Sequence, residues 1–264
     1  MSKSISVCAG FLTGGELPLL NLALHALCRI GCIERVVVLD TTRDRPAEEV
    51  SEKVLLYGRD YGSGFNLPTS KGGFHEVDAR NDLLRRMRSV AQIHRCNWLL
   101  LSDPDELFLP NIIGIIGLAD KVGKESAMIE CWHACNLGQH IVFRDKIRMN
   151  NAEPMYDPHP RAIRLAADYD FVRQHSAAHL HNDTQHCVLP VDMTQSLIHR
   201  NCCHIHVRHM LKHAAGYKAH PEAFPVMPDW PETYRRAFRL GWMQQDGMES
   251  PYYPLPLDDI AIRH

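Results

Sequence analysis

The stretch Asn97–Leu109 reads NWLLLSDPDELFL, and it decides both the fold class and the chemistry expected of this chain. Its first part, Trp98–Leu101, is an apolar run with the length of a strand buried on both faces of a sheet. The run then stops, and three carboxylates follow within four residues: Asp103, Asp105 and Glu106. Carboxylates this close together at a buried strand end repel one another unless a cation lies among them. Hard oxygen ligands of this kind select Mg²⁺ or Mn²⁺. The pattern predicts a metal site there, and an acidic turn with a solvated face is the alternative.

The composition is typical of a folded protein of one large or two small domains. The chain has 264 residues, 45% hydrophobic and 23% charged, with a formal net charge of -2. This charge excludes a global basic field that would bind nucleic acid nonspecifically. The N-terminus lacks the pattern of a secretory signal, and no apolar run approaches the roughly 18 residues of a membrane helix. Nine cysteines without a signal peptide indicate free thiols, so we expect a cytoplasmic protein with no integral membrane segment.

Strands and helices are expected to alternate in the first part of the chain. The sequence predicts strands at residues 5–11, 35–39, 62–68 and 98–101, and helices at residues 18–30, from Pro46 onward and at residues 75–94. This order implies an α/β fold with a mainly parallel sheet flanked by helices, and ligands at the carboxyl ends of the strands. Asp40 and Asp103 each follow a buried strand, so we expect them at one edge, in a crevice for a nucleotide and a metal. A single aspartate at such a position is also a common turn former.

Several short motifs point to one family. Ala79-Arg80-Asn81 opens a predicted helix, and residues 98–108 have a W-hydrophobic-D-x-D-E pattern. Weaker matches are Glu16 and Asp40 after the first two strands, an R-A-I-R…Y-x-F…H segment at residues 161–175, and residues 204–218. Together they resemble the GT-A fold glycosyltransferases of the family 2-like branch. The resemblance implies a GT-A-like catalytic domain over residues 1–218. Residues 219–264 match no motif of that family, and we expect them to form a C-terminal helical extension that packs on this domain, on the acceptor side.

The resemblance also implies a reaction and a set of residue roles. It implies a hexosyltransferase that uses Mn²⁺ or Mg²⁺ and moves a sugar from a nucleotide sugar, UDP-linked, to an unidentified acceptor: a saccharide or a modified base in DNA. The implied metal ligands are Asp105 directly, Asp103 through a metal-bound water, and His204, with His206 as the alternative histidine. The implied donor-binding residues are Glu16, Asp40, Arg80, Asp103, Arg208 and Lys218. The candidates for the base that deprotonates the acceptor are Asp183 and Asp192.

Two other classes of function stay open. The family's glutamate after the histidine is Ser176 here, which favours a non-catalytic module that binds a sugar nucleotide or glycan. Ten of the seventeen histidines lie between His175 and His220, which leaves a histidine-rich metallohydrolase as a third interpretation. Donor binding without turnover would identify the module, and tightly held zinc would identify the hydrolase.

Overall fold

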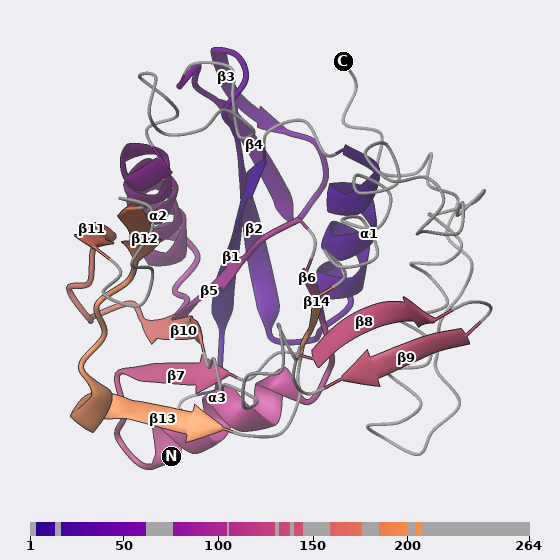
Figure 1. Cartoon of the computed structure of the whole chain (residues 1–264). Coiled ribbons are helices and arrows are strands. Elements are labelled where there is room, and N and C mark those ends of the chain that lie inside the picture. Colours follow the sequence, from indigo (N-terminus) through magenta and orange to yellow (C-terminus); the bar gives the residue numbers. More distant parts are fainter. Residues whose placement is uncertain are drawn as a thin grey trace.

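The computed structural model has a central eight-stranded sheet with helices on both faces (Figure 1). It describes residues 4–13, 17–61, 76–104, 106–129, 132–137, 140–144, 159–175, 185–199 and 204–206. The strands of the central sheet, in spatial order, are β13 (Ser196–His199), β7 (Ser126–Ile129), β10 (His159–Arg164), β5 (Trp98–Ser102), β1 (Val7–Thr13), β2 (Ile33–Asp40), β4 (Val54–Gly58) and β3 (Arg45–Glu49). The helices are α1 (Leu17–Cys28), α2 (Glu76–Ile93) and α3 (Ile112–Lys121), with a short 3₁₀ turn at Met193–Gln195.

The inner strands of the sheet run parallel. β1 pairs in parallel with β2 and β5, and β2 pairs in parallel with β4. β10 is antiparallel to both its neighbours, β5 and β7, while β13 is parallel to β7. The predicted α/β class with a mainly parallel sheet flanked by helices is therefore confirmed. The strands expected near residues 5–11, 35–39 and 98–101 and the helices expected near 18–30 and 75–94 are all present.

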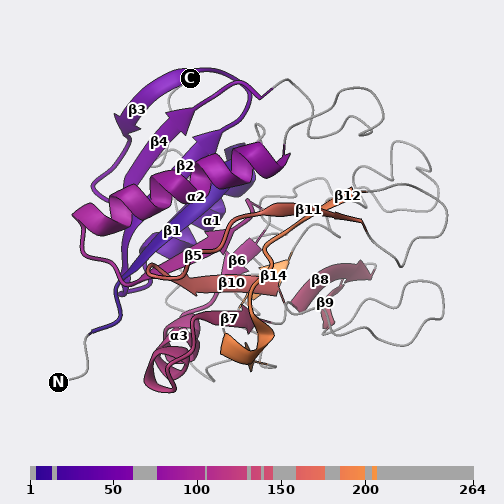
Figure 2. The ribbon, with the colours of Figure 1, turned by 90° about the vertical axis from the view of Figure 1, so that its left-hand side faces the viewer.

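Alternate residues of the inner strands pack against different helices. In β1, Val7, Ala9 and Phe11 belong to the cluster that α1 and α3 cover, whereas Cys8 and Leu12 belong to the cluster under α2. Figure 2 shows α2 lying across the strands, with α1 behind them. Because side chains of a strand alternate between faces, a sheet with helices on both sides needs continuous apolar strands. This explains the uninterrupted apolar run that opens β5.

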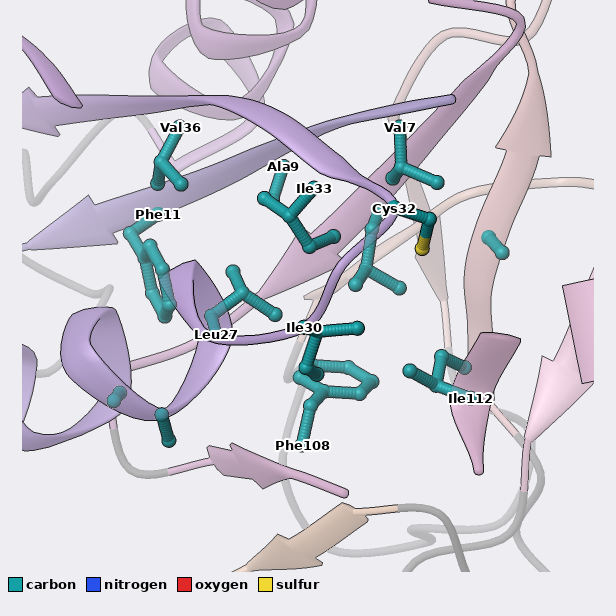
Figure 3. Close-up of a cluster of buried hydrophobic side chains, with 14 of the residues drawn as sticks. Val7, Ala9, Phe11, Leu27, Ile30, Cys32, Ile33, Val36, Phe108 and Ile112 are labelled. Atoms are coloured by element: carbon teal, nitrogen blue, oxygen red, sulfur yellow. The ribbon is translucent and has the colours of Figure 1, made fainter. Parts of the chain in front are cut away.

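The core on the α1 side also anchors the residues that follow the acidic turn. Figure 3 shows Leu27 of α1 and Ile30, just after that helix, on the same side of the sheet as Phe108 and Ile112, with β1 and β2 above them. Phe108 is 1% exposed and Ile112 is fully buried. Burial of these two side chains fixes the chain immediately after the carboxylates of residues 103–106.

Gly10 in β1 allows α2 to lie close to the sheet. A Cβ atom at this position would stand 2.2 Å from Sδ of Met87, whose side chain is fully buried in α2. Any larger residue at position 10 would push against the helix.

Residues 45–58 form a β-hairpin, so the prediction of a helix from Pro46 was wrong. β3 pairs antiparallel with β4, with Arg45 opposite Gly58. β4 buries Val54 and Leu56 next to β2, and the charged β3 then occupies the outer edge of the sheet. Proline and charged side chains are tolerated on an edge strand, and the same residues also suit the first turn of a helix. The strand expected at 62–68 lies outside the described residues.

Two smaller sheets stand beside the central one. The first has the order β6 (Glu106–Phe108), β14 (His204–His206), β8 (Trp132–Leu137) and β9 (His140–Arg144), and the second pairs β11 (Val172–His175) with β12 (Gln185–Val188). β14 is antiparallel to β6 and parallel to β8. Segments about 100 residues apart in the chain are thus hydrogen-bonded neighbours beside α1 (Figure 1).

Three further expectations concern the chain as a whole. The cysteines whose side chains the structure describes are free thiols: Cys8, Cys28, Cys32, Cys96 and Cys187. None of the described helices is long and apolar enough to cross a membrane. The extension expected at residues 219–264, and the helix within it, lie outside the described residues.

Candidate functional site

Asp40 and Asp103 stand at the same edge of the central sheet, as the sequence predicts. Asp40 is the last residue of β2 and pairs with Thr13 at the end of β1. On the other side of β1, Phe11 pairs with Ser102, the last residue of β5, and Asp103 follows. The two aspartates are therefore separated by the single strand β1. In open α/β sheets this carboxyl edge is where ligands bind.

The carboxylate of Asp40 organises the loop that follows β2. Its Oδ1 accepts hydrogen bonds from the backbone N of Thr42 at 2.9 Å and from the hydroxyl of Thr42 at 2.6 Å. Its Oδ2 accepts one from Nε of Arg43 at 3.2 Å. Asp40 is only 7% exposed, so these bonds compensate a nearly buried charge. The residue thus acts as a turn former at the carboxyl edge of the sheet.

The acidic turn after β5 is closed by its own backbone and side chains. The backbone N of Glu106 donates to the carbonyl of Asp103 at 3.0 Å. In return, Oε2 of Glu106 accepts from the backbone N of Asp103 at 3.1 Å. Glu106 is 1% exposed, whereas the Asp103 side chain is 25% exposed. Asp105, which lies between them, is outside the described residues.

Two arginines meet the carboxylates of this turn. Nη1 of Arg80, from α2, lies 3.1 Å from Oδ1 of Asp103. Nη2 of Arg161, from β10, lies 3.5 Å from Oδ2 of Asp103 and forms an ion pair with Oε1 of Glu106. Both oxygens of Asp103 therefore face a guanidinium. The arginines supply the compensating charge that the sequence interpretation assigned to a metal ion.

Arg80 is held in its charged form by its neighbours. Burial alone would lower its pKa, but Asp103 and Glu76 outweigh burial and raise the pKa of Arg80 above its usual range. Nε of Arg80 donates to Oε1 of Glu76 at 2.8 Å. Arg80 is thus a permanent positive charge at the carboxyl edge, next to Asp103.

The described side chains do not by themselves form a metal centre. Within the part of the chain that the structure describes, no three His, Cys, Asp or Glu side chains are grouped so that they would hold a metal ion. Asp103, predicted as a metal ligand, faces Arg80 and Arg161. The donor set expected for Mn²⁺ or Mg²⁺ therefore depends on Asp105, His204 and His206, whose side chains the structure does not describe.

The backbone of β14 brings two of these predicted ligands beside the turn. In the antiparallel pair with β6, His206 is opposite Glu106 and His204 is opposite Phe108. The sequence analysis expects a histidine from the C-terminal segment to reach the carboxylates. The register places the backbone of this segment next to the acidic turn. Binding of a metal by either histidine stays a prediction.

The two candidates for the catalytic base differ in their placement. Asp192 precedes β13, whose first residue Ser196 pairs with Ser126 at the start of β7. That is the amino edge of the sheet, opposite to the edge that carries Asp40, and the structure does not bring Asp192 near it. The Asp192 carboxylate instead accepts from the backbone and hydroxyl of Thr194, at 2.8 and 2.7 Å. The other candidate, Asp183, lies outside the described residues, as do Glu16, Arg208 and Lys218.

Asn81, part of the Ala79-Arg80-Asn81 motif, holds a backbone segment against α2. Its Nδ2 donates to the carbonyl of Phe171 at 3.0 Å, and its Oδ1 accepts from the backbone N of Phe171 at 2.7 Å. The guanidinium of Arg80 lies 5.6 Å from the centre of the Phe171 ring. β11 begins at the next residue, so these contacts fix the start of the β11–β12 pair beside α2 (Figure 2).

A shallow depression of about 450 Å³ lies near the first turns of α2 and the end of β4. It is lined by Arg59, Asp60, Tyr61, Asp78, Asn81 and Arg85. This open, polar hollow lies at the same edge of the sheet as Asp40. The backbone N of Arg59, one of its lining residues, donates a hydrogen bond to the carbonyl of Asp40 at 2.9 Å.

The partnership of Arg161 with the acidic turn was not predicted from the sequence. Arg161 belongs to a motif of the resemblance and had no assigned role there. The available signal is that Arg161 begins the short, largely apolar run RAIRL, where an arginine needs an acidic partner once the strand is buried. Sequence spacing alone does not reveal which carboxylate lies opposite.

Comparisons with known proteins identify no family. No family model matches the chain, and no curated protein matches it. Among solved structures, Staphylococcus aureus TarS 1-349 has 12% identity and a TM-score of 0.45, over 89% of this chain and 70% of that one. The complex of TarS 1-349 with UDP-GlcNAc has 12% identity and a TM-score of 0.45, over 93% and 68%. A 4-diphosphocytidyl-2C-methyl-D-erythritol synthase has 12% identity and a TM-score of 0.35, over 61% and 76%. These values establish neither a shared family nor a shared activity.

Proposed function

We propose that this protein is a glycosyltransferase that takes a hexose from a UDP-linked sugar. The observation that supports the proposal is the placement of Asp40 and Asp103 one strand apart at the carboxyl edge of the sheet, with Arg80 beside Asp103. A parallel sheet binds nucleotides at this edge. The motif resemblance around residues 79–108 supports the same assignment.

The residues at this edge divide between the two ends of the donor. Asp40, Arg80 and Glu16 hold the nucleoside, and Asp103 accepts from the ribose hydroxyls. Arg208 and Lys218 pair with the diphosphate as it leaves, because charge-assisted contacts to phosphate oxygens strengthen as negative charge accumulates.

A divalent ion, Mn²⁺ or Mg²⁺, is part of the proposal, with Asp105 as its carboxylate ligand and His204 or His206 as a neutral one. When bound, such an ion neutralises the leaving diphosphate as a Lewis acid. The acceptor, a saccharide or a modified base in DNA, loses its hydroxyl proton to a carboxylate. The two candidates for this carboxylate are Asp183 and Asp192, and Asp192 precedes β13 at the amino edge of the sheet.

The decisive experiment measures UDP release from a panel of UDP-sugars without acceptor, in Mn²⁺, in Mg²⁺ and in chelator. Without an acceptor, water takes the place of the acceptor hydroxyl, so we expect UDP release that depends on the metal. Matched reactions with GDP- and TDP-sugars test the choice of base. Absence of both turnover and binding with every common nucleotide sugar would contradict the proposal.

A second candidate function is a binding module that holds a sugar nucleotide without transferring the sugar. The carboxylates that the structure describes at the carboxyl edge favour this function, because each already has hydrogen-bonding or ionic partners. They are Asp40, Asp103 and Glu106. Within the described residues, none of these three is left to act as a base. Calorimetry with UDP-sugars separates the two functions, since a module binds the donor and yields no product across an acceptor panel.

A further inference from the structure

The pairing of Glu106 with Arg161 joins two parts of the chain at a buried point. Glu106 is 1% exposed and the side chain of Arg161 is 13% exposed. Arg161 comes from β10, 55 residues after Glu106, and its Nη2 is also 3.5 Å from Asp103. A buried carboxylate without such a partner would be strongly destabilising.

The charges of the turn are nearly balanced by arginine alone. Asp103, Asp105 and Glu106 contribute three negative charges, and Arg80 and Arg161 return two positive ones. Asp103 bridges the two guanidinium groups, one on each carboxylate oxygen. The described part of the turn therefore has compensated charges and closed hydrogen bonds with no divalent ion.

We infer that Arg161 is a positioning residue that holds Asp103 and Glu106 in place of a metal ion, so that Arg161 and a divalent cation compete for the same carboxylates. The inference rests on the proposed function only in that it concerns the same turn. This competition lowers the affinity of the free protein for divalent cations. Arg161 also holds the carboxylates of Asp103 and Glu106 in position before any ligand binds.

β10 offers a matched control for this role. Arg164, three residues further on, forms an ion pair with Asp120, with Nη1 3.0 Å from Oδ1. It pairs in register with Trp98, at the amino edge of the sheet. Arg161→Gln removes the ion pairs with Asp103 and Glu106, and Arg164→Gln removes the ion pair with Asp120, from opposite ends of the same strand.

The test is thermal melting of the wild type, Arg161→Gln, Arg161→Lys and Arg164→Gln, each in chelator and in millimolar Mn²⁺ alone. We expect wild-type melting to change by less than about 2 °C between the two conditions. Arg161→Gln melts lower in chelator, and Mn²⁺ restores a large part of that loss. Arg164→Gln also melts lower, and Mn²⁺ restores none of it. Arg161→Lys keeps a charge but loses the forked geometry, so its Mn²⁺ response is intermediate.

Equal Mn²⁺ responses of Arg161→Gln and the wild type, including no response in either, would overturn the inference. Should Arg161→Gln fail to fold, Arg161→Lys decides, because a response equal to that of the wild type then overturns it as well. A large loss of wild-type stability on chelation would show that a metal holds the turn, which also contradicts the inference. None of these readouts involves a sugar nucleotide, so a failure of the proposed function is recognised separately, by the donor assay.

Discussion

The backbone of His206 lies opposite that of Glu106, in the antiparallel pair between β14 and β6. His204 is opposite Phe108, two residues further from the acidic turn. Two residues that are 100 positions apart in the chain are therefore neighbours across a short strand pair. This register ranks the two histidines that the sequence analysis leaves as alternatives.

We predict that His206→Ala weakens Mn²⁺-dependent UDP release more than His204→Ala does. The reason is that His206 pairs across the strands with Glu106, which belongs to the acidic turn, whereas His204 pairs with Phe108, two residues beyond it. Loss of one neutral ligand is partly compensated by water, so the expected effect is about 10–100-fold. The measurement is the Mn²⁺ concentration that gives half-maximal UDP release for each variant. The opposite ranking would return His204 to first place.

Asp105→Asn is expected to lower UDP release by orders of magnitude and to leave the fold intact. The amide keeps the shape of the side chain and removes a formal charge from the expected ligand set. Melting in chelator should stay the same or rise slightly, because Asp103 and Glu106 no longer face a third carboxylate. Asp170→Asn, on a carboxylate that is 61% exposed, serves as the control. If Asp105→Asn releases UDP at the wild-type rate, residues 103–106 form only an acidic turn and not a metal site.

Gly10→Ala should destabilise the fold through α2. The added Cβ would lie 2.2 Å from Sδ of Met87, and overpacking of this kind costs about 1–3 kcal/mol. Gly10→Ala combined with Met87→Ala should cost less than the sum of the two single changes, because the shorter side chain vacates the space. Gly114→Ala in α3, where nothing lies within 4 Å, is the matched control and should be neutral or stabilising. The measurement is the free energy of unfolding in urea.

His25 should make stability fall as the solution becomes acidic. Burial, together with the nearby charge of Arg29, lowers the pKa of His25 from 6.5 to about 4. Between these two values the unfolded chain binds a proton that the folded protein does not, so stability decreases as pH falls through this window. His25→Gln cannot bind the proton, and its melting temperature should fall less steeply over the same range. Parallel slopes for the variant and the wild type would contradict this assignment.

The local sequence pattern was sufficient to predict the strands and the helix that carry the candidate site. The apolar run of β5, the helical spacing of α2 and the acidic residues after two strands predict a sheet edge that brings Asp40 and Asp103 together. Pattern failed at residues 45–49, where proline and glutamates suit either a helix start or an edge strand. The edge strand formed because the apolar β4 lies next to β2 and leaves β3 on the rim.

The sequence by itself determined the α/β class, the buried strand that ends in carboxylates and the edge at which they gather, because these follow from hydrophobic periodicity and strand order. Only the tertiary structure decided what compensates those carboxylates. Arg161 pairs with Glu106, 55 residues earlier, and β14 pairs with β6, about 100 residues earlier. Asp192 precedes β13 at the opposite edge of the sheet. Such pairings depend on which strands become neighbours in the sheet, and sequence spacing does not encode that neighbourhood.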